Sequence, residues 1–205
     1  MDARRPLAVV TPTLDGDVLA VLALVEDTMT TGQLHRMLPK FSEDGIRKVL
    51  MRLREQGIVL SERGGNAYLY RFNRDHVAAD PIAQLANARV ILLQRIEMLL
   101  GSWLSPPVYA AVFGSMARGT GSVHSDVDLF LVRSDEASDD LWASQVEDLR
   151  RKVTKWSGND ARPLEFSVAE LLERATERVV KDVAEQGLTV FGQRSWFQRQ
   201  VRVRQ

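Results

Sequence analysis

The stretch 114-GSMARGTGSVHSDVDLFL-131 determines the fold expected for the second half of the chain. One short apolar run, 108–113, precedes it, and a second, 126–132, contains its last residues. Short runs of β-branched and aromatic residues bounded by turn residues are typical of buried strands. The stretch therefore predicts a strand, a glycine-containing turn that opens a helix, a loop, and a second strand.

The turn after the first of these strands carries residue types that bind phosphate. Gly114 has no side chain, so an anion can approach the backbone closely. The N–H groups at a strand-to-helix turn point toward such an anion. Ser115 can donate its hydroxyl to the same oxygens, and Arg118 supplies a fixed positive charge. We therefore predict a phosphate-binding turn here.

The second strand presents two carboxylates. Because side chains alternate along a strand, Asp126 and Asp128 point to one side, and Val127, Leu129 and Leu131 point to the other side, into the core. Two neighbouring carboxylates repel each other unless a cation lies between them. Mg²⁺ fits, because it prefers one or two carboxylates together with phosphate oxygens and water.

The motif that joins these features resembles a known signature. Gly114-Ser115, Ala117-Arg118-Gly119, Ser125-Asp126 and Asp128-Leu129 match the GSxARG…SDxDL pattern of the DNA polymerase beta-like nucleotidyltransferases, and most resemble their small bacterial branch, the minimal nucleotidyltransferases. The resemblance covers about residues 83–192. It implies a short mixed sheet flanked by helices, two Mg²⁺ ions, and a nucleoside triphosphate, with ATP the expected one. It also implies a nucleotide-binding role for Gly114, Ser115, Arg118 and Ser125.

The same resemblance implies the reaction and one more site residue. An acceptor hydroxyl attacks the α-phosphate and pyrophosphate leaves. The family uses a third carboxylate on a later strand, and the next strand candidate is 163–168, in which Glu165 alternates with Leu164 and Phe166. We predict Asp126, Asp128 and Glu165 as the catalytic and metal-binding residues. An exposed glutamate on an edge strand is the alternative for Glu165, since the family more often has aspartate there.

The first third of the chain has a different pattern. Apolar residues at helical spacing predict helices over 17–27, 33–38 and 43–56. Two β-prone runs around Gly64-Gly65-Asn66 then predict a hairpin over 58–72. Three helices followed by a hairpin resemble a winged helix-turn-helix. The resemblance implies that helix 43–56 enters the major groove and that the hairpin contacts backbone or minor groove.

Local charge is consistent with nucleic-acid binding. Between residues 36 and 74 the chain has nine basic and four acidic residues. The residues predicted to contact DNA lie off the apolar stripe or in the hairpin, and they are Arg47, Lys48, Arg52, Arg54 and Arg63. Two alternatives remain, a solvated helix face and a protein–protein module. Glu43 and Asp44 count against tight DNA binding, since a recognition helix usually meets the groove with its first turn.

A connecting segment and a basic tail complete the expected α+β architecture. Pro81 fits the first turn of one long helix that ends near Leu104, and its wide apolar stripe indicates burial between domains or in a homodimer. We expect a winged helix-turn-helix domain over 1–75, a connecting helix over 76–107 and a nucleotidyltransferase domain over 108–205. That domain ends in an arginine-rich tail, which we expect to bind nucleic acid, to bind acidic partners, or to be mobile. Its basic residues are Arg194, Arg199, Arg202 and Arg204.

Composition sets the remaining bounds. The 205 residues are 45% hydrophobic and 26% charged, which is typical of a soluble globular protein. Lys+Arg and Asp+Glu both number 27, so any basic surface must be local. The absence of cysteine excludes disulfides and thiolate metal sites and favours a reducing compartment. The first residues, MDARRPLAVV, lack the core of a signal peptide, and no apolar window could span a bilayer. We expect a cytoplasmic protein without membrane contact.

Three functions are compatible with these patterns. The first is Mg²⁺-dependent transfer of a nucleoside monophosphate from a triphosphate to an unknown acceptor hydroxyl, coupled to a DNA-binding winged helix. The second is a transcriptional regulator whose nucleotidyltransferase fold senses nucleotide or is inactive. The third is an antitoxin-like protein that acts on a partner protein.

Overall fold

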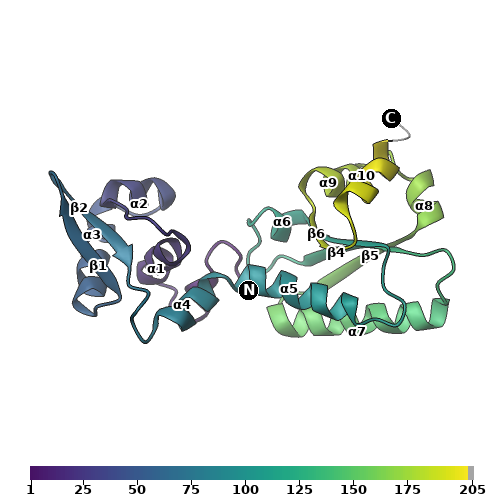
Figure 1. Cartoon of the computed structure of the whole chain (residues 1–205), viewed down its shortest axis with the longest axis horizontal. Helices are drawn as coiled ribbons and strands as arrows, with labels where there is room; N and C mark the ends of the chain where they lie inside the picture. The colour runs from purple at the N-terminus through teal and green to yellow at the C-terminus, as the bar shows by residue number, and fades with distance from the viewer. Residues whose placement is uncertain (203–205) are drawn as a thin grey trace. The chain divides into compact units, whose positions relative to one another are not determined.

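The computed structural model describes residues 1–202. The chain forms two compact units, drawn in Figure 1. The N-terminal unit holds Asp2 and the chain from Arg4 to Arg89, and the C-terminal unit begins at Val90 and also includes Met1 and Ala3.

The N-terminal unit contains three principal helices followed by a hairpin, in the order expected from sequence. Its elements are η1 (Pro6–Val9), α1 (Leu14–Leu24), α2 (Thr31–Met37), α3 (Glu43–Glu55), β1 (Val59–Gly64), β2 (Ala67–Phe72) and α4 (Ala79–Ala86). The strands β1 and β2 pair antiparallel around Gly65-Asn66. Mixed helix and strand in this unit agrees with the expected α+β class.

Capping residues fix where α2 and α3 begin. The Thr30 side chain accepts from the Gln33 backbone N–H, and the Gln33 side chain accepts in return from the Thr30 N–H. Ser42 Oγ accepts from the Gly45 N–H, 3.1 Å away, at the start of α3. The core of the unit is formed where the helices meet the hairpin, by residues that include Val18, Leu22, Leu34, Ile46, Leu50 and Val59.

The long helix expected over the connector is two helices. After α4 ends at Ala86, α5 runs from Ala88 to Gly101. Asn87 separates them, and both its backbone N–H and its side-chain amide donate to the Ala83 carbonyl, at 3.0 and 2.9 Å. The wide apolar stripe has two parts. Ala79 and Ala86 pack into the core of the N-terminal unit, while Leu92, Ile96 and Leu100 pack into the C-terminal one.

The C-terminal unit is built on a four-stranded mixed sheet in the order β5-β4-β3-β6. Strand β4 pairs parallel with β5 and antiparallel with β3, which pairs antiparallel with β6. The mixed sheet with flanking helices confirms that part of the sequence expectation. After α5, its elements are β3 (Tyr109–Phe113), α6 (Gly114–Ala117), β4 (Val127–Arg133), α7 (Asp139–Ser157), β5 (Ala161–Ser167), α8 (Val168–Glu173), α9 (Arg178–Gln186), β6 (Leu188–Phe191) and α10 (Arg194–Arg202).

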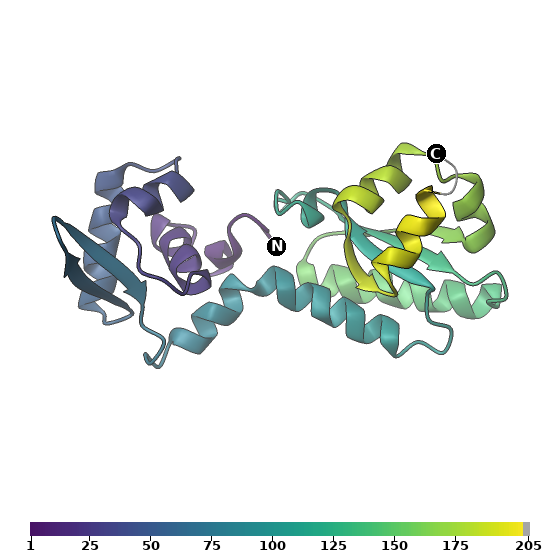
Figure 2. The same cartoon turned by 45° about the horizontal axis from the view of Figure 1, so that its top comes forward.

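Helices cover both faces of this sheet, as Figures 1 and 2 show. Val127, Leu129 and Leu131 of β4 face the layer that holds α5 and α7. Phe130 and Val132, which alternate with them, face the layer of α8, α9 and α10. The expected inward orientation of the first set is confirmed, and a second core lies on the other face.

The arginine-rich tail is largely a packed helix rather than a free segment. Phe197 and Val201 of α10 are buried, and the Phe197 ring stacks on Tyr109 with the centroids 4.4 Å apart. Arg194 donates to the carbonyl oxygens of Ala184 and Glu185 at 3.1 and 3.0 Å. Apolar residues between the arginines thus attach the segment to the sheet, while Arg204 lies outside the described residues. None of the helices in 1–202 has the length and apolarity needed to cross a bilayer.

Candidate nucleotide and metal site

The candidate site lies where β3 ends and β4 begins. Gly114 follows Phe113, whose register partner on β4 is Asp128. The backbone of Gly114 has φ +67°, and a Cβ atom at this position would collide with the Asp128 carboxylate. Glycine is therefore required here for two reasons, the left-handed backbone and the carboxylate packed against it.

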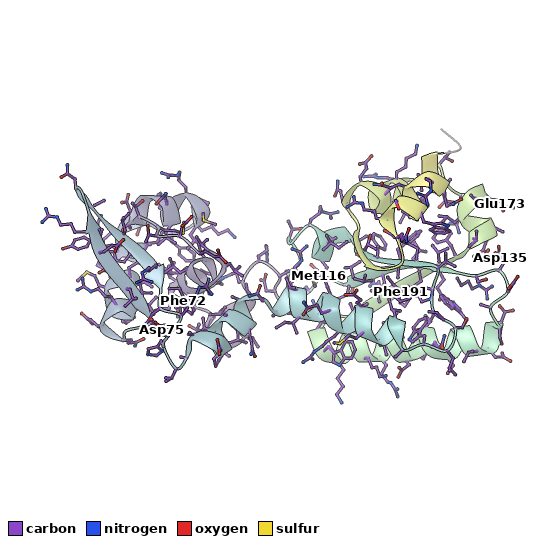
Figure 3. All side chains as sticks on the ribbon, in the orientation of Figure 1. Phe72, Asp75, Met116, Asp135, Glu173 and Phe191 are labelled. Carbon is purple, nitrogen blue, oxygen red and sulfur yellow. The ribbon has the colours of Figure 1, made fainter. Side chains whose placement is uncertain are left out.

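The short helix α6 carries the chain away from this glycine. Met116 is fully buried and anchors α6 to the sheet, whereas Arg118 just after it is exposed. The Ser115 carbonyl accepts from the N–H groups of Thr120 and Gly121, at 2.9 and 3.1 Å, which turns the loop back toward β4. Met116 and Asp135 are labelled at opposite ends of the sheet in Figure 3, and the candidate site is at the Met116 end.

Asp126 and Asp128 lie on one face of β4, as alternation predicts. Asp128 is partly buried, and burial raises the pKa of its carboxyl. The negative charge of Asp126 raises this pKa further, while Arg162 and Arg118 offset part of the effect. Because the two carboxylates are close together and one is partly buried, added positive charge stabilises their ionised forms.

The structure adds Arg162 to this site. It is the register partner of Asp128 on β5, and its Nη1 lies 3.0 Å from Asp126 Oδ2. Its position beside a strand start was a detectable signal, because an arginine there can face a neighbouring strand. The expected strand began at 163 instead of Ala161, and that shift of two residues left Arg162 outside the strand.

Glu165 does not join the carboxylate pair. In the parallel register of β4 and β5, Glu165 pairs with Leu131, so it lies on the opposite face of the sheet from Asp128. Its Oε2 accepts from Trp142 Nε1 of α7 across 2.6 Å. This is the exposed glutamate on an edge strand, the alternative considered from sequence, and it corrects the expectation that Glu165 faces the pair.

Ser125 shapes the loop before the pair. Its Oγ accepts from the Ser122 N–H at 2.9 Å. The buried amide of Asn159 donates to the carbonyl oxygens of Ser122 and Ser125, at 3.0 and 2.7 Å. Sequence reasoning missed Asn159, because a single asparagine in a turn carries no signal for such a contact. Ser125 and Asn159 thus hold the loop that leads directly into Asp126.

The donor set fits one divalent cation. Asp126 and Asp128 supply two carboxylates, and Mg²⁺ commonly takes one or two carboxylates together with phosphate oxygens and water. Within 1–202, no group of three or more His, Cys, Asp or Glu side chains could hold a metal ion. The described residues therefore offer no three-carboxylate cluster of the kind expected for two ions.

The N-terminal unit has its own hollow between α3 and the hairpin. Its volume is about 710 Å³. Arg47, Met51 and Arg54 of α3 line one side, and Tyr68 and Tyr70 of β2 line another. These α3 residues are spaced at i, i+4 and i+7, so they share one helix face, apart from the buried stripe. The hollow thus combines two arginines with two aromatic rings, and its lining also includes Glu43, whose Oε1 lies 3.8 Å from Arg47 Nη2.

The other predicted DNA-contacting residues lie elsewhere. Arg52 forms an ion pair with Asp15 of α1. Lys48 Nζ lies 2.9 Å from Asp44 Oδ2 on the exposed side of α3. Arg63 is exposed in β1 near the hairpin turn. The structure therefore gathers only Arg47 and Arg54 of the five in one hollow.

Comparison with protein families identifies the domain that contains the carboxylate pair. Residues 100–188 match the family model of a nucleotidyltransferase domain. This confirms the nucleotidyltransferase resemblance for that stretch and supports a transferase type of activity. No curated protein matches the chain.

Solved structures show loose likenesses. A toxin–antitoxin structure with AMP-PNP is 20% identical, with a TM-score of 0.40, over 53% of this chain and 80% of that one. A Shewanella oneidensis complex of a tri-AMPylated HEPN toxin with an MNT antitoxin is 16% identical, with a TM-score of 0.37, over 55% and 80%. The archaeal chromatin protein TrmBL2 is 16% identical, with a TM-score of 0.31, over 91% and 78%.

Proposed function

We propose that the C-terminal unit transfers a nucleoside monophosphate from a nucleoside triphosphate to an acceptor hydroxyl, in a reaction that depends on Mg²⁺. The observation that carries the proposal is the Asp126–Asp128 pair on one strand face, packed against the Gly114 turn. The match of residues 100–188 to a nucleotidyltransferase domain supports it.

The residues divide into two roles. Asp126 and Asp128 would hold the metal ion, which when bound polarises phosphate oxygens and neutralises charge on them. Gly114, Ser115 and Arg118 would bind the phosphates, through close backbone approach, a hydroxyl donor and a fixed positive charge. ATP is the proposed donor. Glu165 has no role in this proposal, because it lies on the other face of the sheet.

The proposed reaction forms a bond between the acceptor oxygen and the α-phosphorus and breaks the bond to the departing pyrophosphate, while the proton of the acceptor hydroxyl is released to water. Phosphoryl-type transfer relies mainly on positioning and charge neutralisation, with little covalent chemistry left to the protein. A site with two carboxylates and nearby arginines meets that requirement.

The test is transfer of label from [α-³²P]ATP in the presence of Mg²⁺. The acceptors to include are the protein itself, any protein that co-purifies with it, RNA ends and small hydroxyl-rich molecules. Asp126→Asn and Asp128→Asn should each reduce transfer by about 100-fold or more, as loss of a group that stabilises transition-state charge does. Glu165→Gln is the matched control and should retain transfer. Absence of both transfer and Mg²⁺-dependent ATP binding in the wild type would contradict the proposal.

A second proposal concerns the N-terminal unit, which would bind DNA as a winged helix. Its support is the hollow between α3 and the hairpin, which places Arg47 and Arg54 beside Tyr68. Arginine and aromatic side chains together suit contact with a charged backbone and with sugar and base surfaces. Binding of fluorescent duplexes by the full chain at several salt concentrations tests it, and no binding at low salt contradicts it.

A further inference from the structure

Arg162 occupies the position on β5 directly beside the carboxylate pair. The β4–β5 register pairs it with Asp128, and the residues that share its face of the sheet include Leu164 and Phe166. Its Nη1 is 3.0 Å from Asp126 Oδ2. One oxygen of the pair therefore already has a positive partner supplied by the chain.

Among residues 1–202, no third His, Cys, Asp or Glu side chain completes a metal-binding group with the pair. On the β3 side the register partner of Asp128 is Phe113, and the carboxylate packs against the backbone of Gly114, so neither residue adds a ligand. Asp160, the acidic residue just before β5, exerts its charge on Arg150 of α7. Among the described residues it forms no three-ligand cluster with Asp126 and Asp128. A second divalent cation would thus have to share the same two carboxylates, next to a guanidinium.

Charge balance points the same way. The two carboxylates carry two negative charges, and Arg162 contributes one positive charge in direct contact, with Arg118 within Coulombic range of Asp128. One divalent cation added to this set already brings the total above neutrality. Adding another doubly charged ion at short range is opposed by Coulomb repulsion, which only strong anionic ligands offset.

We infer that Arg162 limits the protein's own metal site to a single divalent cation and supplies, as a tethered guanidinium, the positive charge that a second ion would otherwise bring. This inference rests on the proposed function only in taking Asp126 and Asp128 as the metal ligands. It assigns to Arg162 a role in setting metal stoichiometry and affinity.

The test is titration of the full chain with Mn²⁺ in the absence of nucleotide. The electron paramagnetic resonance signal of free Mn²⁺ measures how much of the metal remains unbound. The wild type should bind one ion at this site. Arg162→Ala should bind one ion about three- to tenfold more tightly, the modest effect expected because the Arg162 side chain is 68% exposed and its charge is screened. Arg162→Lys should remain close to the wild type. Arg162→Asp, which adds a carboxylate, should bind two.

The matched control is Arg151→Ala. It removes the same charge from α7, where Arg151 pairs with Asp148 on an exposed surface, and should leave Mn²⁺ binding unchanged. Far-ultraviolet circular dichroism of each variant checks folding. If Arg162→Asp fails to fold, the comparison of Arg162→Ala with Arg162→Lys decides. Two ions in the wild type, or equal Mn²⁺ affinity in the wild type and Arg162→Ala, would overturn the inference.

The outcomes separate this inference from the proposed function. If the wild type binds no Mn²⁺ and Arg162→Ala binds one ion, the inference of a single-cation site in the wild type is overturned, while Mg²⁺-dependent ATP binding and transfer still decide the proposed function. If both bind one ion equally, the Arg162 inference fails and the proposed function is untouched. If neither binds Mn²⁺ without nucleotide, the Arg162 inference is overturned, and the proposed function is contradicted only if Mg²⁺-dependent ATP binding and transfer are also absent.

Discussion

Trp142 donates its indole N–H to Glu165 Oε2 across 2.6 Å, and this bond lies on the opposite face of the sheet from Asp128. The carboxylates of Glu165 and Asp128, which the sequence analysis placed in one site, thus lie on opposite faces of the sheet. Glu165 contributes to how α7 packs on β5, while Asp128 belongs to the candidate site.

The first prediction follows from that separation. Glu165→Gln keeps an acceptor for Trp142, so both thermal stability and nucleotidyl transfer should remain near wild type. Glu165→Ala removes the acceptor and should lower the free energy of unfolding by about 1 kcal/mol, with transfer retained below the melting temperature. Thermal denaturation and the [α-³²P]ATP assay measure the two effects. If Glu165→Gln lost as much transfer as Asp128→Asn, Glu165 would have a role in the reaction and this prediction would be contradicted.

The second prediction concerns Asn159 and the loop before the carboxylate pair. Asn159→Ala leaves the carbonyl oxygens of Ser122 and Ser125 without their amide donor at a buried position. The free energy of unfolding should fall by roughly 1–3 kcal/mol, and Mg²⁺-dependent ATP binding should weaken, because the loop leads directly into Asp126. Isothermal titration at a temperature where the variant is folded measures the affinity. Unchanged affinity would show that the loop does not position the pair.

The third prediction concerns stability and pH in the presence of a chelator. Because the pKa of Asp128 is raised in the folded protein, the native state holds its proton more tightly than the unfolded chain does. The contribution of Asp128 to the free energy of unfolding should therefore fall as pH rises from the ordinary aspartate pKa through the raised value. Asp128→Asn does not titrate and escapes this loss.

Asp128→Asn should consequently be more stable than the wild type at neutral pH, by less than about 1 kcal/mol because the carboxyl is only partly buried and solvent screens it. The difference should disappear at a pH below the ordinary aspartate pKa. Denaturant unfolding at several pH values provides the measurement. A variant that is less stable than the wild type at neutral pH would mean that Asp128 is stabilised as a carboxylate without metal.

The fourth prediction distinguishes three arginines of α3. Arg54→Ala and Arg47→Ala should weaken binding of duplex DNA and reduce the slope of log K against log salt by about one each, as expected for a lost phosphate contact. Arg52→Ala removes the ion pair with Asp15 and should mainly reduce the stability of the N-terminal unit. Fluorescence anisotropy across salt concentrations, together with thermal melts, separates the effects. Equal losses of DNA affinity in all three variants would contradict this division.

Sequence periodicity predicted most elements of both units, because each apolar stripe or alternating run faces one core. The orientation of Asp126 and Asp128 followed from alternation along a single strand. The position of Glu165 did not, since it depends on the register between two strands far apart in the chain. Shifting a strand by one residue moves every side chain to the other face.

Two other features of the structure differ from the sequence expectations. The break at Asn87 is a one-residue interruption of an otherwise continuous helical pattern, at a residue whose side-chain amide donates to the Ala83 carbonyl. The packing of α10 depends on Phe197 and Val201 meeting Tyr109 and Phe130, which lie much earlier in the chain. Local sequence contains the arginines of that segment but not the surface that its apolar residues cover.

The most direct test of the candidate site is a crystal structure of the full chain with Mn²⁺ and a non-hydrolysable ATP analogue, in which anomalous scattering locates the metal. We expect Mn²⁺ on the carboxylates of Asp126 and Asp128, with the triphosphate against Gly114, Ser115 and Arg118. Nucleotide bound elsewhere, or Mn²⁺ held by other residues while Asp126 and Asp128 remain without it, would contradict the account.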